Sequence, residues 1–367
     1  MALQCGIVGL PNVGKSTTFN ALTRGKALAA NYPFATKDPN VGVITVPDTR
    51  LDKLAELVDP QRTVPTTVEI VDIAGLIKGA SQGEGLGNQF LANIREVDAI
   101  VHVVRCFEDD NVVHVDGSVN PVRDKEIIDI ELGLKDLETV EKRMDKTARA
   151  AKVGSKDDVR DLEILKNIKA HLETGRPVRD MMADMDEEGK RLMKELSLLT
   201  GKPVLYVCNV DEASLKTGND HTRTFEKAVA GENAEIVLLS ADIEAQIADM
   251  ESAEERIEFL EMMGLDEPGA NKLIRTCYKL LDLITYFTAG VKEVRAWTVR
   301  NGAKAPEAAG VIHSDFEKGF IRAEVIKYND FVTLGSEAKV KEAGKMSVEG
   351  KEYVVGDGDV MHFRFNV

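Results

Sequence analysis

The stretch that decides the fold reads Gly9-Leu10-Pro11-Asn12-Val13-Gly14-Lys15-Ser16, a complete GxxxxGKS phosphate-binding loop. A short and mostly apolar run, Gln4–Val8, precedes the loop and is suited to a buried strand, and residues 16–23 follow it with the character of a helix. Because the motif stands between a strand and a helix, it predicts an α/β P-loop nucleoside triphosphatase with a Ras-like arrangement.

The residue types in the loop indicate how it would bind phosphate and Mg²⁺. Glycine lets the backbone curl so that N–H groups and the helix N-terminus cradle phosphate oxygens. Lys15 is expected to reach the β- and γ-phosphates as a point charge, which places it among both the binding and the catalytic groups, and the Ser16 hydroxyl is expected to bind Mg²⁺. The predicted nucleotide-binding set of the loop is Asn12, Val13, Gly14, Lys15, Ser16 and Thr17.

A second phosphate-side element is Asp72-Ile73-Ala74-Gly75, which ends a strand-like run over residues 67–71. Asp72 is expected at the carboxyl end of a strand, holding Mg²⁺ through water, and the Gly75 N–H is expected to approach the γ-phosphate. A DxxG sequence alone is better explained as an ordinary turn after a strand. Its position downstream of a phosphate-binding loop favours the nucleotide site.

Two further segments have the character of nucleotide-dependent switches. Thr36, in Asn31-Tyr32-Pro33-Phe34-Ala35-Thr36, is the candidate that closes on Mg²⁺ and the γ-phosphate. Residues 75–88 are rich in glycine, which indicates a second switch of low local stability. The alternatives are a loop threonine without a ligand and an inert flexible loop.

These motifs, together with Asp-Ile-Ala-Gly-Leu-Ile-Lys-Gly-Ala, Gly-Glu-Gly-Leu-Gly-Asn and Asn-Val-Asp-Glu, resemble those of the YchF or Obg-like ATPase family of P-loop proteins. The resemblance spans nearly the whole chain. It implies a nucleotide domain, an inserted helical coiled-coil hairpin and a C-terminal TGS domain of the β-grasp type. It also implies a preference for ATP, or its acceptance, and contact with the ribosome.

The base-reading motif departs from that of a GTPase. Asn209-Val210-Asp211-Glu212 stands where Asn-Lys-x-Asp is usual, and Glu212 is one methylene too long for the paired hydrogen bonds that aspartate accepts from guanine. Val210 replaces the lysine that packs over the base. The Glu212 carboxylate offers no group that would select adenine. We therefore expect backbone groups to contact the base, such as those of Ser240 and Ala241, which follow the strand-like run Glu235–Leu239.

The hydrolytic residues are less evident from the sequence. Leu76 occupies the position of the water-orienting glutamine of Ras-like enzymes, and leucine cannot orient water. His114, in the polar segment 107–114, is the candidate for that role, either entering the site or simply facing solvent. We therefore expect slow intrinsic turnover.

Composition limits the remaining possibilities. A chain of 367 residues with net charge -15 can hold two or three domains and is a poor nonspecific ligand for nucleic acid. The four cysteines lie far apart without a CxxC pair, and no apolar run reaches transmembrane length, so we expect reduced cysteines in a cytoplasmic protein that does not bind membranes.

Residues 125–199 are expected to form the insertion. A stripe with 3-4 spacing predicts a long helix, and after a break at Gly154 a second helical run returns. The stripe consists of Ile127, Ile130, Leu134, Leu137, Glu141, Met144, Ala148 and Ala151. Basic residues gather near the hairpin tip and could face RNA, although charged helices are usually only solvated: Lys142, Arg143, Lys146, Arg149, Lys152, Lys156 and Arg160.

Three interpretations compete. The favoured one is a Mg²⁺-dependent ATPase switch with a nucleotide domain over residues 1–124 and 200–280 and a TGS-like domain over 281–367, meeting ribosomal RNA through the hairpin tip and the TGS domain and binding GTP more weakly. The second is a GTPase with a variant base motif. The third is a small-molecule kinase, which would need an acceptor pocket and a basic lid.

Overall fold

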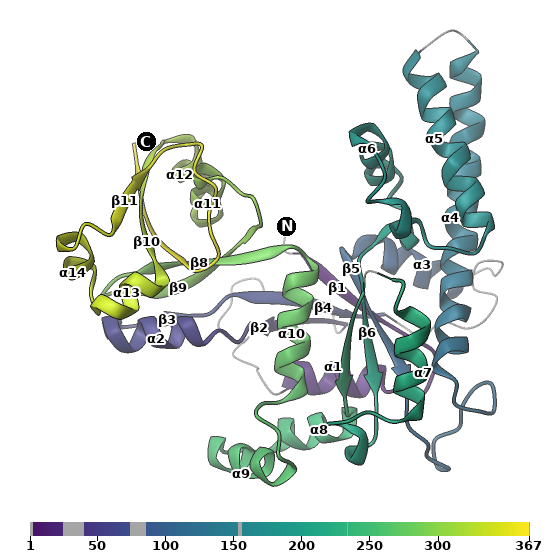
Figure 1. Ribbon diagram of the computed structural model, residues 1–367, viewed down its shortest axis with the longest axis horizontal. Coiled ribbons are helices and arrows are strands. Elements are labelled where there is room, and N and C mark those ends of the chain that lie inside the picture. Colours follow the sequence, from purple (N-terminus) through teal and green to yellow (C-terminus); the bar gives the residue numbers. More distant parts are fainter. Residues whose placement is uncertain (1–2, 25–39, 74–85, 153–155, 233, 367) are drawn as a thin grey trace. The chain divides into compact units, whose positions relative to one another are not determined.

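The computed structural model describes residues 3–24, 40–73, 86–152, 156–232 and 234–366. Their contacts divide the chain into two units, drawn in Figure 1: unit 1 comprises Met1–Val43 and Glu69–Leu273, and unit 2 comprises Ile44–Val68 and Ile274–Val367. The sequence analysis placed residues 44–68 in the nucleotide domain, whereas the contacts of this segment group it with the C-terminal unit. Each unit contains a six-stranded sheet.

The sheet of unit 1 has the strand order β2-β4-β1-β5-β6-β7. Its strands are β1 (Gln4–Val8), β2 (Val41–Thr45), β4 (Thr67–Asp72), β5 (Ala99–Arg105), β6 (Val204–Asn209) and β7 (Glu235–Leu239). The pairs β4-β1, β1-β5, β5-β6 and β6-β7 are parallel, and every residue of β5 and β6 is buried. The loops that follow these five strands therefore meet at one edge of the sheet.

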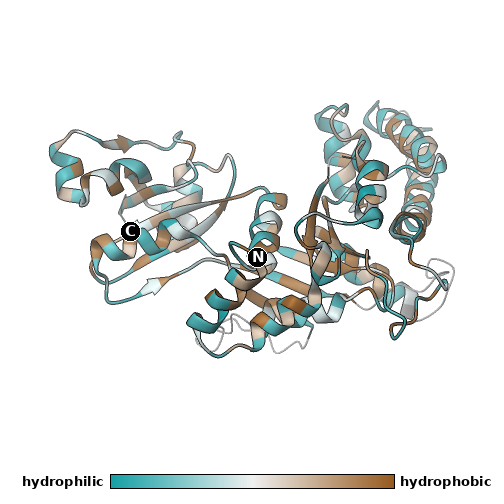
Figure 2. Ribbon diagram, turned by 60° about the horizontal axis from the view of Figure 1, so that its bottom comes forward, coloured by the Kyte–Doolittle hydropathy of each residue, from teal (hydrophilic) through white to brown (hydrophobic). Residues whose placement is uncertain are grey.

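Helices cover this sheet and extend beyond it (Figure 1). They are α1 (Lys15–Arg24), α3 (Leu86–Glu96), α4 (Pro121–Ala151), α5 (Lys156–Glu173), α6 (Glu187–Leu196), α7 (Asp220–Val229), α8 (Ala241–Asp249) and α9 (Ala253–Met263). The next helix, α10 (Gly269–Leu280), begins in unit 1 and ends in unit 2. Short 3₁₀ turns are η2 (Val178–Met181), η3 (Leu199–Gly201) and η4 (Glu212–Ser214). Figure 2 shows that the strands of this sheet are strongly hydrophobic, whereas the helices carry both hydrophobic and hydrophilic residues.

The long helix α4 packs against α5, but its buried face differs from the expected stripe. Ile128, Leu132 and Val140 are buried, whereas the stripe residues Ile130 and Leu134 are 57% and 42% exposed. The reason is that α4 changes partners along its length, contacting β5 and α7 as well as α5. In the stripe's second half Glu141 accepts a hydrogen bond from Lys169 of α5 at 2.7 Å. The expected turn at Gly154 lies outside the described residues.

A buried carboxylate fastens α4 to the chain that returns to β6. Asp136 is fully buried, and its two oxygens accept hydrogen bonds from the backbone N–H groups of Leu199 and Thr200, each at 2.7 Å. The Thr200 hydroxyl adds a third bond at 2.7 Å. Burial raises the pKa of Asp136, and these hydrogen bonds oppose the rise.

The sheet of unit 2 has the order β11-β10-β12-β8-β9-β3. Its strands are β3 (Thr63–Val64), β8 (Leu283–Ala289), β9 (Val294–Arg300), β10 (Phe320–Lys327), β11 (Met346–Glu349) and β12 (Asp359–Phe365). The pairs β11-β10, β10-β12 and β8-β9 are antiparallel, whereas β12-β8 and β9-β3 are parallel. The helices of unit 2 are α2 (Thr49–Val58), α11 (Ala305–Ile312), α12 (Ser314–Lys318), α13 (Tyr328–Leu334) and α14 (Glu337–Glu342).

The segment 44–68 is part of the core of unit 2. Asp48 caps α2 by accepting from the Arg50 N–H at 3.0 Å, and the helix places Leu51 and Leu54 in a cluster with Phe287 of β8. β3 then pairs with β9, so the edge of the sheet comes from a distant part of the sequence.

All four cysteines are buried and free, as the sequence predicted for reduced core thiols. Within the described ranges, no helix combines the length and the apolar character that a bilayer crossing requires.

Candidate functional site

The loop after β1 depends on backbone conformations that favour glycine. Gly9 and Gly14 have φ values of 155° and 97°, and Asn12 has a φ of 62°. A Cβ atom at Gly9 would lie 2.5 Å from the Val103 carbonyl oxygen, and one at Gly14 would collide with the side-chain amide of Asn209. The glycines therefore let the loop approach both β5 and the end of β6 closely.

Lys15, the first residue of α1, lies over its own loop. Its side chain is 8% exposed, and its ammonium group donates to the Leu10 carbonyl at 2.8 Å. Burial lowers the pKa of Lys15, and the charge of Asp72 opposes that shift. The ammonium group is thus partly desolvated, which strengthens its attraction for an anion at the loop.

Ser16 and Asp72 meet at the carboxyl edge of the sheet. The Ser16 hydroxyl donates to Asp72 Oδ2 at 3.2 Å. Burial raises the pKa of Asp72, while the Ser16 hydrogen bond and the Lys15 charge lower it. A hydroxyl and a carboxylate in contact beside a phosphate-binding loop are the oxygen ligands that Mg²⁺ prefers, so these two residues fit that ion. Thr36, Gly75 and Leu76 lie outside the described residues.

Asn209, at the end of β6, joins two loops of the site. Its Nδ2 donates to the Val13 carbonyl at 2.9 Å, and its Oδ1 accepts from the Ala241 N–H at 2.9 Å. Asn209 is 4% exposed. Both ends of the amide are therefore used to hold the phosphate-binding loop beside the N-terminus of α8, where Ser240 is the cap residue.

The remaining residues of the base motif have contrasting surroundings. Val210 is 2% exposed, and its N–H donates to the Leu239 carbonyl at 2.9 Å, so its side chain belongs to the core. Glu212 is exposed at the start of η4, and Asp211 caps that turn by accepting from the Ser214 N–H at 2.9 Å. Glu212 and Asp211 are thus both exposed, whereas Val210 is buried.

His114 is neither a solvent-facing histidine nor a group already placed at the phosphates. It is 7% exposed, and its Nε2 lies 2.8 Å from Oδ2 of Asp124 in α4. Its Nδ1 accepts from the Asp116 N–H at 3.1 Å, so the ring proton is on Nε2 and is donated to Asp124. The neighbouring Val113 and Val115 are 74% and 55% exposed.

The loop that carries His114 is tied to the phosphate-binding loop. Asn12 Nδ2 donates to the Val113 carbonyl at 3.0 Å. Arg105, the last residue of β5, also binds this loop and is 2% exposed. Its guanidinium donates to the backbone carbonyls of Phe107 at 3.1 Å, Asp109 at 3.1 Å and Val112 at 2.7 Å. Sequence reasoning missed Arg105. The available signal was a charged residue at the end of a strand that is otherwise apolar except for His102.

His114, Asp116 and Asp124 also have ligand atoms within 4.8 Å of one another, a spacing that could suit a metal ion. Both ring nitrogens of His114 are engaged, however, and Asp124 Oδ1 accepts from Arg123 at 3.0 Å. His114 and Asp124 therefore satisfy one another without a metal, whereas the exposed Asp116 carboxylate lies 3.8 Å from Arg123.

Comparisons with known proteins agree with this geometry. The family model MMR_HSR1, described as a 50S ribosome-binding GTPase, matches residues 4–143, and the model YchF-GTPase_C, described as a protein of unknown function (DUF933), matches residues 283–366. The ribosome-binding ATPase YchF of Bacillus subtilis strain 168 is 56% identical over 369 residues, and that of Escherichia coli O157:H7 is 55% identical over 367, with 100% of each chain covered. The solved structure of the Schizosaccharomyces pombe YchF GTPase matches with a TM-score of 0.89 at 41% identity, covering 99% of this chain and 97% of that one.

Proposed function

The chain belongs to the YchF family, and we propose that it is an ATP-hydrolysing switch protein that binds the ribosome. The observation that carries this proposal is the convergence of Lys15, Ser16, Asp72 and Asn209 at one edge of the parallel sheet. Relatives of the same length that are named ribosome-binding ATPases support it. Nucleoside triphosphatase activity follows from the same two observations.

Phosphate binding uses groups that are already near one another. Lys15 exchanges its bond to the Leu10 carbonyl for the β- and γ-phosphate oxygens, which are stronger acceptors because they are charged. Ser16 and Asp72 would hold Mg²⁺. Thr36 as a further ligand and the Gly75 N–H as a donor to the γ-phosphate belong to the same proposal, and both residues lie outside the described ranges. Bound Mg²⁺ neutralises charge that develops on the phosphoryl group.

Base selection favours ATP over GTP. Asn209 positions the loops, and Glu212 lies at the surface with a side chain too long for the guanine fit. The backbone at Ser240 and Ala241, beside Asn209, supplies the nearest groups for the base edge. The alternative is a GTPase with a variant base motif, which would be supported if the protein bound GTP more tightly.

Hydrolysis requires His114 to leave Asp124. The imidazole then becomes free to orient water, a role that Leu76 cannot fill. Val113 and Val115, on either side of His114, are exposed, so the loop turns these apolar side chains outward and the His114 imidazole inward. Asn12, bonded to Val113, gives the phosphate-binding loop a direct contact with this loop, so occupancy of the phosphate site can bias the change.

Ribosomal RNA contact is assigned to the α4–α5 hairpin and to residues 281–367 as a TGS-like domain, with 125–199 as the insertion. Several basic residues expected at the hairpin tip are already paired: Arg143 with Glu195 at 3.5 Å, and Arg160 with Asp186 at 2.6 Å. Among the described residues of this set, four form no ion pair and are exposed: Lys146, Arg149, Lys152 and Lys156. They are the stronger candidates for phosphate contact.

The test compares nucleotides on the nucleotide-free protein. ATP and GTP dissociation constants are measured by equilibrium titration, with and without Mg²⁺, followed by cosedimentation with ribosomes in each nucleotide state. Tighter ATP binding and nucleotide-dependent cosedimentation are expected. A clear GTP preference would overturn the ATPase assignment, and nucleotide-independent cosedimentation would overturn the switch.

A further inference from the structure

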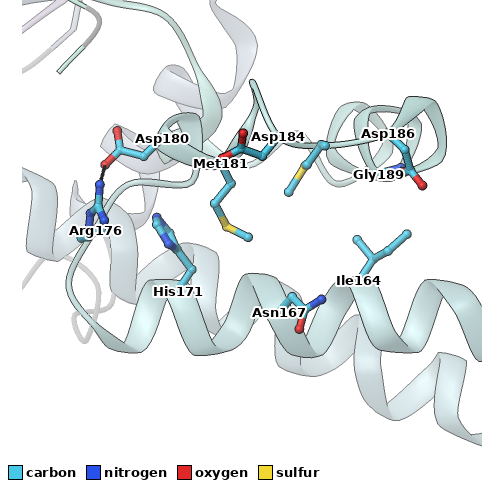
Figure 3. Close-up of a pocket in the computed structure, with 10 residues that line it drawn as sticks. Ile164, Asn167, His171, Arg176, Asp180, Met181, Asp184, Asp186 and Gly189 are labelled. Atoms are coloured by element: carbon cyan, nitrogen blue, oxygen red, sulfur yellow. Dashed lines mark hydrogen bonds and ion pairs between the residues drawn. The ribbon is translucent and has the colours of Figure 1, made fainter. Parts of the chain in front are cut away.

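A cavity of about 530 Å³ lies between α5, the η2 segment and the start of α6, away from the nucleotide edge. Figure 3 shows His171, Asn167 and Ile164 rising from α5, with Asp180, Met181 and Asp184 opposite them. All of its lining residues belong to unit 1 and to the α4–α6 region. The nucleotide mechanism uses none of them.

Carboxylates dominate the charge of this cavity. Asp180, Asp184 and Asp186 line it, against one lining guanidinium, Arg176, which lies 3.1 Å from Asp180. Asp186 accepts from the Gly189 N–H at 2.9 Å and pairs with Arg160. Within the described part of the chain, the Asp184 carboxylate has no hydrogen bond or ion pair. Since Asp180 is paired with Arg176 and Asp186 with Arg160, the carboxylate that the cavity offers to a cation is that of Asp184.

A histidine adds a neutral acceptor. His171 Nε2 lies 3.0 Å from the Pro177 carbonyl, which can only accept, so the ring proton of the neutral imidazole is on Nε2. This leaves Nδ1 of His171 as an acceptor. The acceptors of the cavity are thus spread over several groups, which suits a ligand with several donors rather than a single point charge.

The rest of the lining is apolar. Met181 and Met185 are half-buried and pack, with Ile164, against the core cluster of the hairpin. Thioether side chains adapt to the shape of a flexible aliphatic chain. The combination of dispersed acceptors and an apolar floor matches an arginine side chain, whose methylene stem is apolar and whose guanidinium presents five donors.

A second cavity, of about 330 Å³, adjoins the first at Arg176, which lines both. It is lined mainly by apolar residues, including Ile130, Leu134 and Leu172. Ile130 and Leu134 are the α4 residues that the expected stripe would have buried and that the structure leaves 57% and 42% exposed. A lone cation would contact only the first cavity. A polypeptide with an aliphatic side chain near its arginine would place one side chain in each cavity.

We propose that the cavity between α5, η2 and α6 binds an arginine side chain of a partner polypeptide, and that the adjoining α4 cavity takes a neighbouring aliphatic side chain. This peptide-docking surface is independent of the ATPase proposal, since it shares no residue with the nucleotide site. The partner is defined by chemistry: a basic segment in which arginine stands close to leucine, isoleucine or valine.

The test uses the full-length protein with ¹³C-methyl methionine and a capped peptide, Leu-Ala-Arg-Leu, titrated to millimolar concentration. The methyl resonances of Met181 and Met185 are expected to shift saturably, while those of methionines outside the cavities stay still. A peptide with citrulline in place of arginine keeps the shape and removes the charge. It is expected to bind at least about fivefold more weakly, because the charge-assisted contacts are lost.

Variants separate the two cavities. Asp184→Asn is expected to weaken the arginine peptide about fivefold and to leave the citrulline peptide unchanged, whereas Asp145→Asn, a matched exposed aspartate of α4, changes neither. Leu134→Ala is expected to weaken both peptides about threefold, because contact with an aliphatic side chain is lost. Equal binding of the two peptides overturns the arginine assignment. Unchanged binding in Leu134→Ala overturns the polypeptide assignment.

Discussion

His114 and Asp124 form a buried pair, Nε2 to Oδ2 at 2.8 Å, in which the imidazole is held by the first turn of α4. Release of His114 breaks this bond and the one that its Nδ1 accepts from Asp116. A hydrogen bond to a charged group contributes about 1.5–3 kcal/mol, so the released conformation is disfavoured by roughly one to two orders of magnitude. The pair thus offers a physical cause for the slow intrinsic turnover that we expect of this protein.

Replacing His114 by alanine is expected to lower kcat with little change in nucleotide affinity, since a contact made only in the transition state affects the barrier and not ground-state binding. Leu76→Ala is the comparison variant and should be mild, because leucine has no hydrogen bond to lose. Single-turnover hydrolysis and equilibrium nucleotide binding are measured on both. Normal turnover in His114→Ala would assign water orientation to another group.

Asp124→Asn is expected to act in the opposite direction. The amide keeps the size of the carboxylate but accepts a weaker hydrogen bond, which makes release of His114 easier. Intrinsic turnover should rise about threefold to tenfold by the same energetics, and the double variant with His114→Ala should lose the gain. If Asp124→Asn slows hydrolysis while retaining its thermal stability, the pair supports the active conformation instead of restraining it.

Lys15→Met tests the phosphate site. Methionine retains an aliphatic side chain in the buried position while removing the charge, so the fold should remain intact and ATP binding should fall by at least about a hundredfold. Fluorescent ATP titration gives the affinity, and thermal unfolding provides the control for stability. Wild-type ATPase activity, with contaminating enzymes excluded, would remove the assignment of this site.

Glu212→Asp tests base choice. Glu212 is exposed, so shortening it carries little risk to the fold, and the aspartate restores the acceptor geometry for guanine. A matched bidentate contact contributes about 1–3 kcal/mol, which predicts a shift of the ATP/GTP affinity ratio toward GTP of roughly tenfold. Val210→Lys in combination is a poorer test, because Val210 is 2% exposed and a lysine would need to leave the core. An unchanged ratio in Glu212→Asp means that residue 212 does not contact the base edge.

Leu54→Ala tests the assembly of unit 2. Leu54 is fully buried in the cluster with Phe287 and Val294, and its truncation should cost about 2–5 kcal/mol of unfolding free energy. Trp297 in β9 is the single tryptophan of the chain, so its fluorescence during urea unfolding reports on this unit. Lys53→Ala, on the same helix and exposed, is the control. An unaltered Trp297 transition in Leu54→Ala would contradict the role of α2 in this core.

The sequence predicted best what is encoded locally. The phosphate-binding loop and its strand and helix were evident because eight adjacent residues specify one backbone path. The parallel strands β4, beside β1, and β6, beyond β5, then bring Asp72 and Asn209 to the same edge. The buried face of α4 was wrong in its first half, because a periodic pattern does not say when a helix changes partners. His114 and Asp124 meet through the fold of a loop that no periodicity describes. Residues 44–68 were assigned to the nucleotide domain, because nothing local in the sequence indicates which sheet they join.

Unit 2 is built from two segments that lie far apart in the sequence, and this fixes the order in which its parts are synthesised. Thr66 and Thr298, whose hydroxyls are hydrogen-bonded, are 232 positions apart, so a ribosome adding about 5–20 residues per second needs roughly ten to fifty seconds to pass from one to the other. During that interval Leu51 and Leu54 of α2 have emerged without β8 and β9, the strands that later cover them. The nascent chain therefore carries these apolar side chains uncovered for most of its elongation, and the core of this unit can close only when translation is nearly finished.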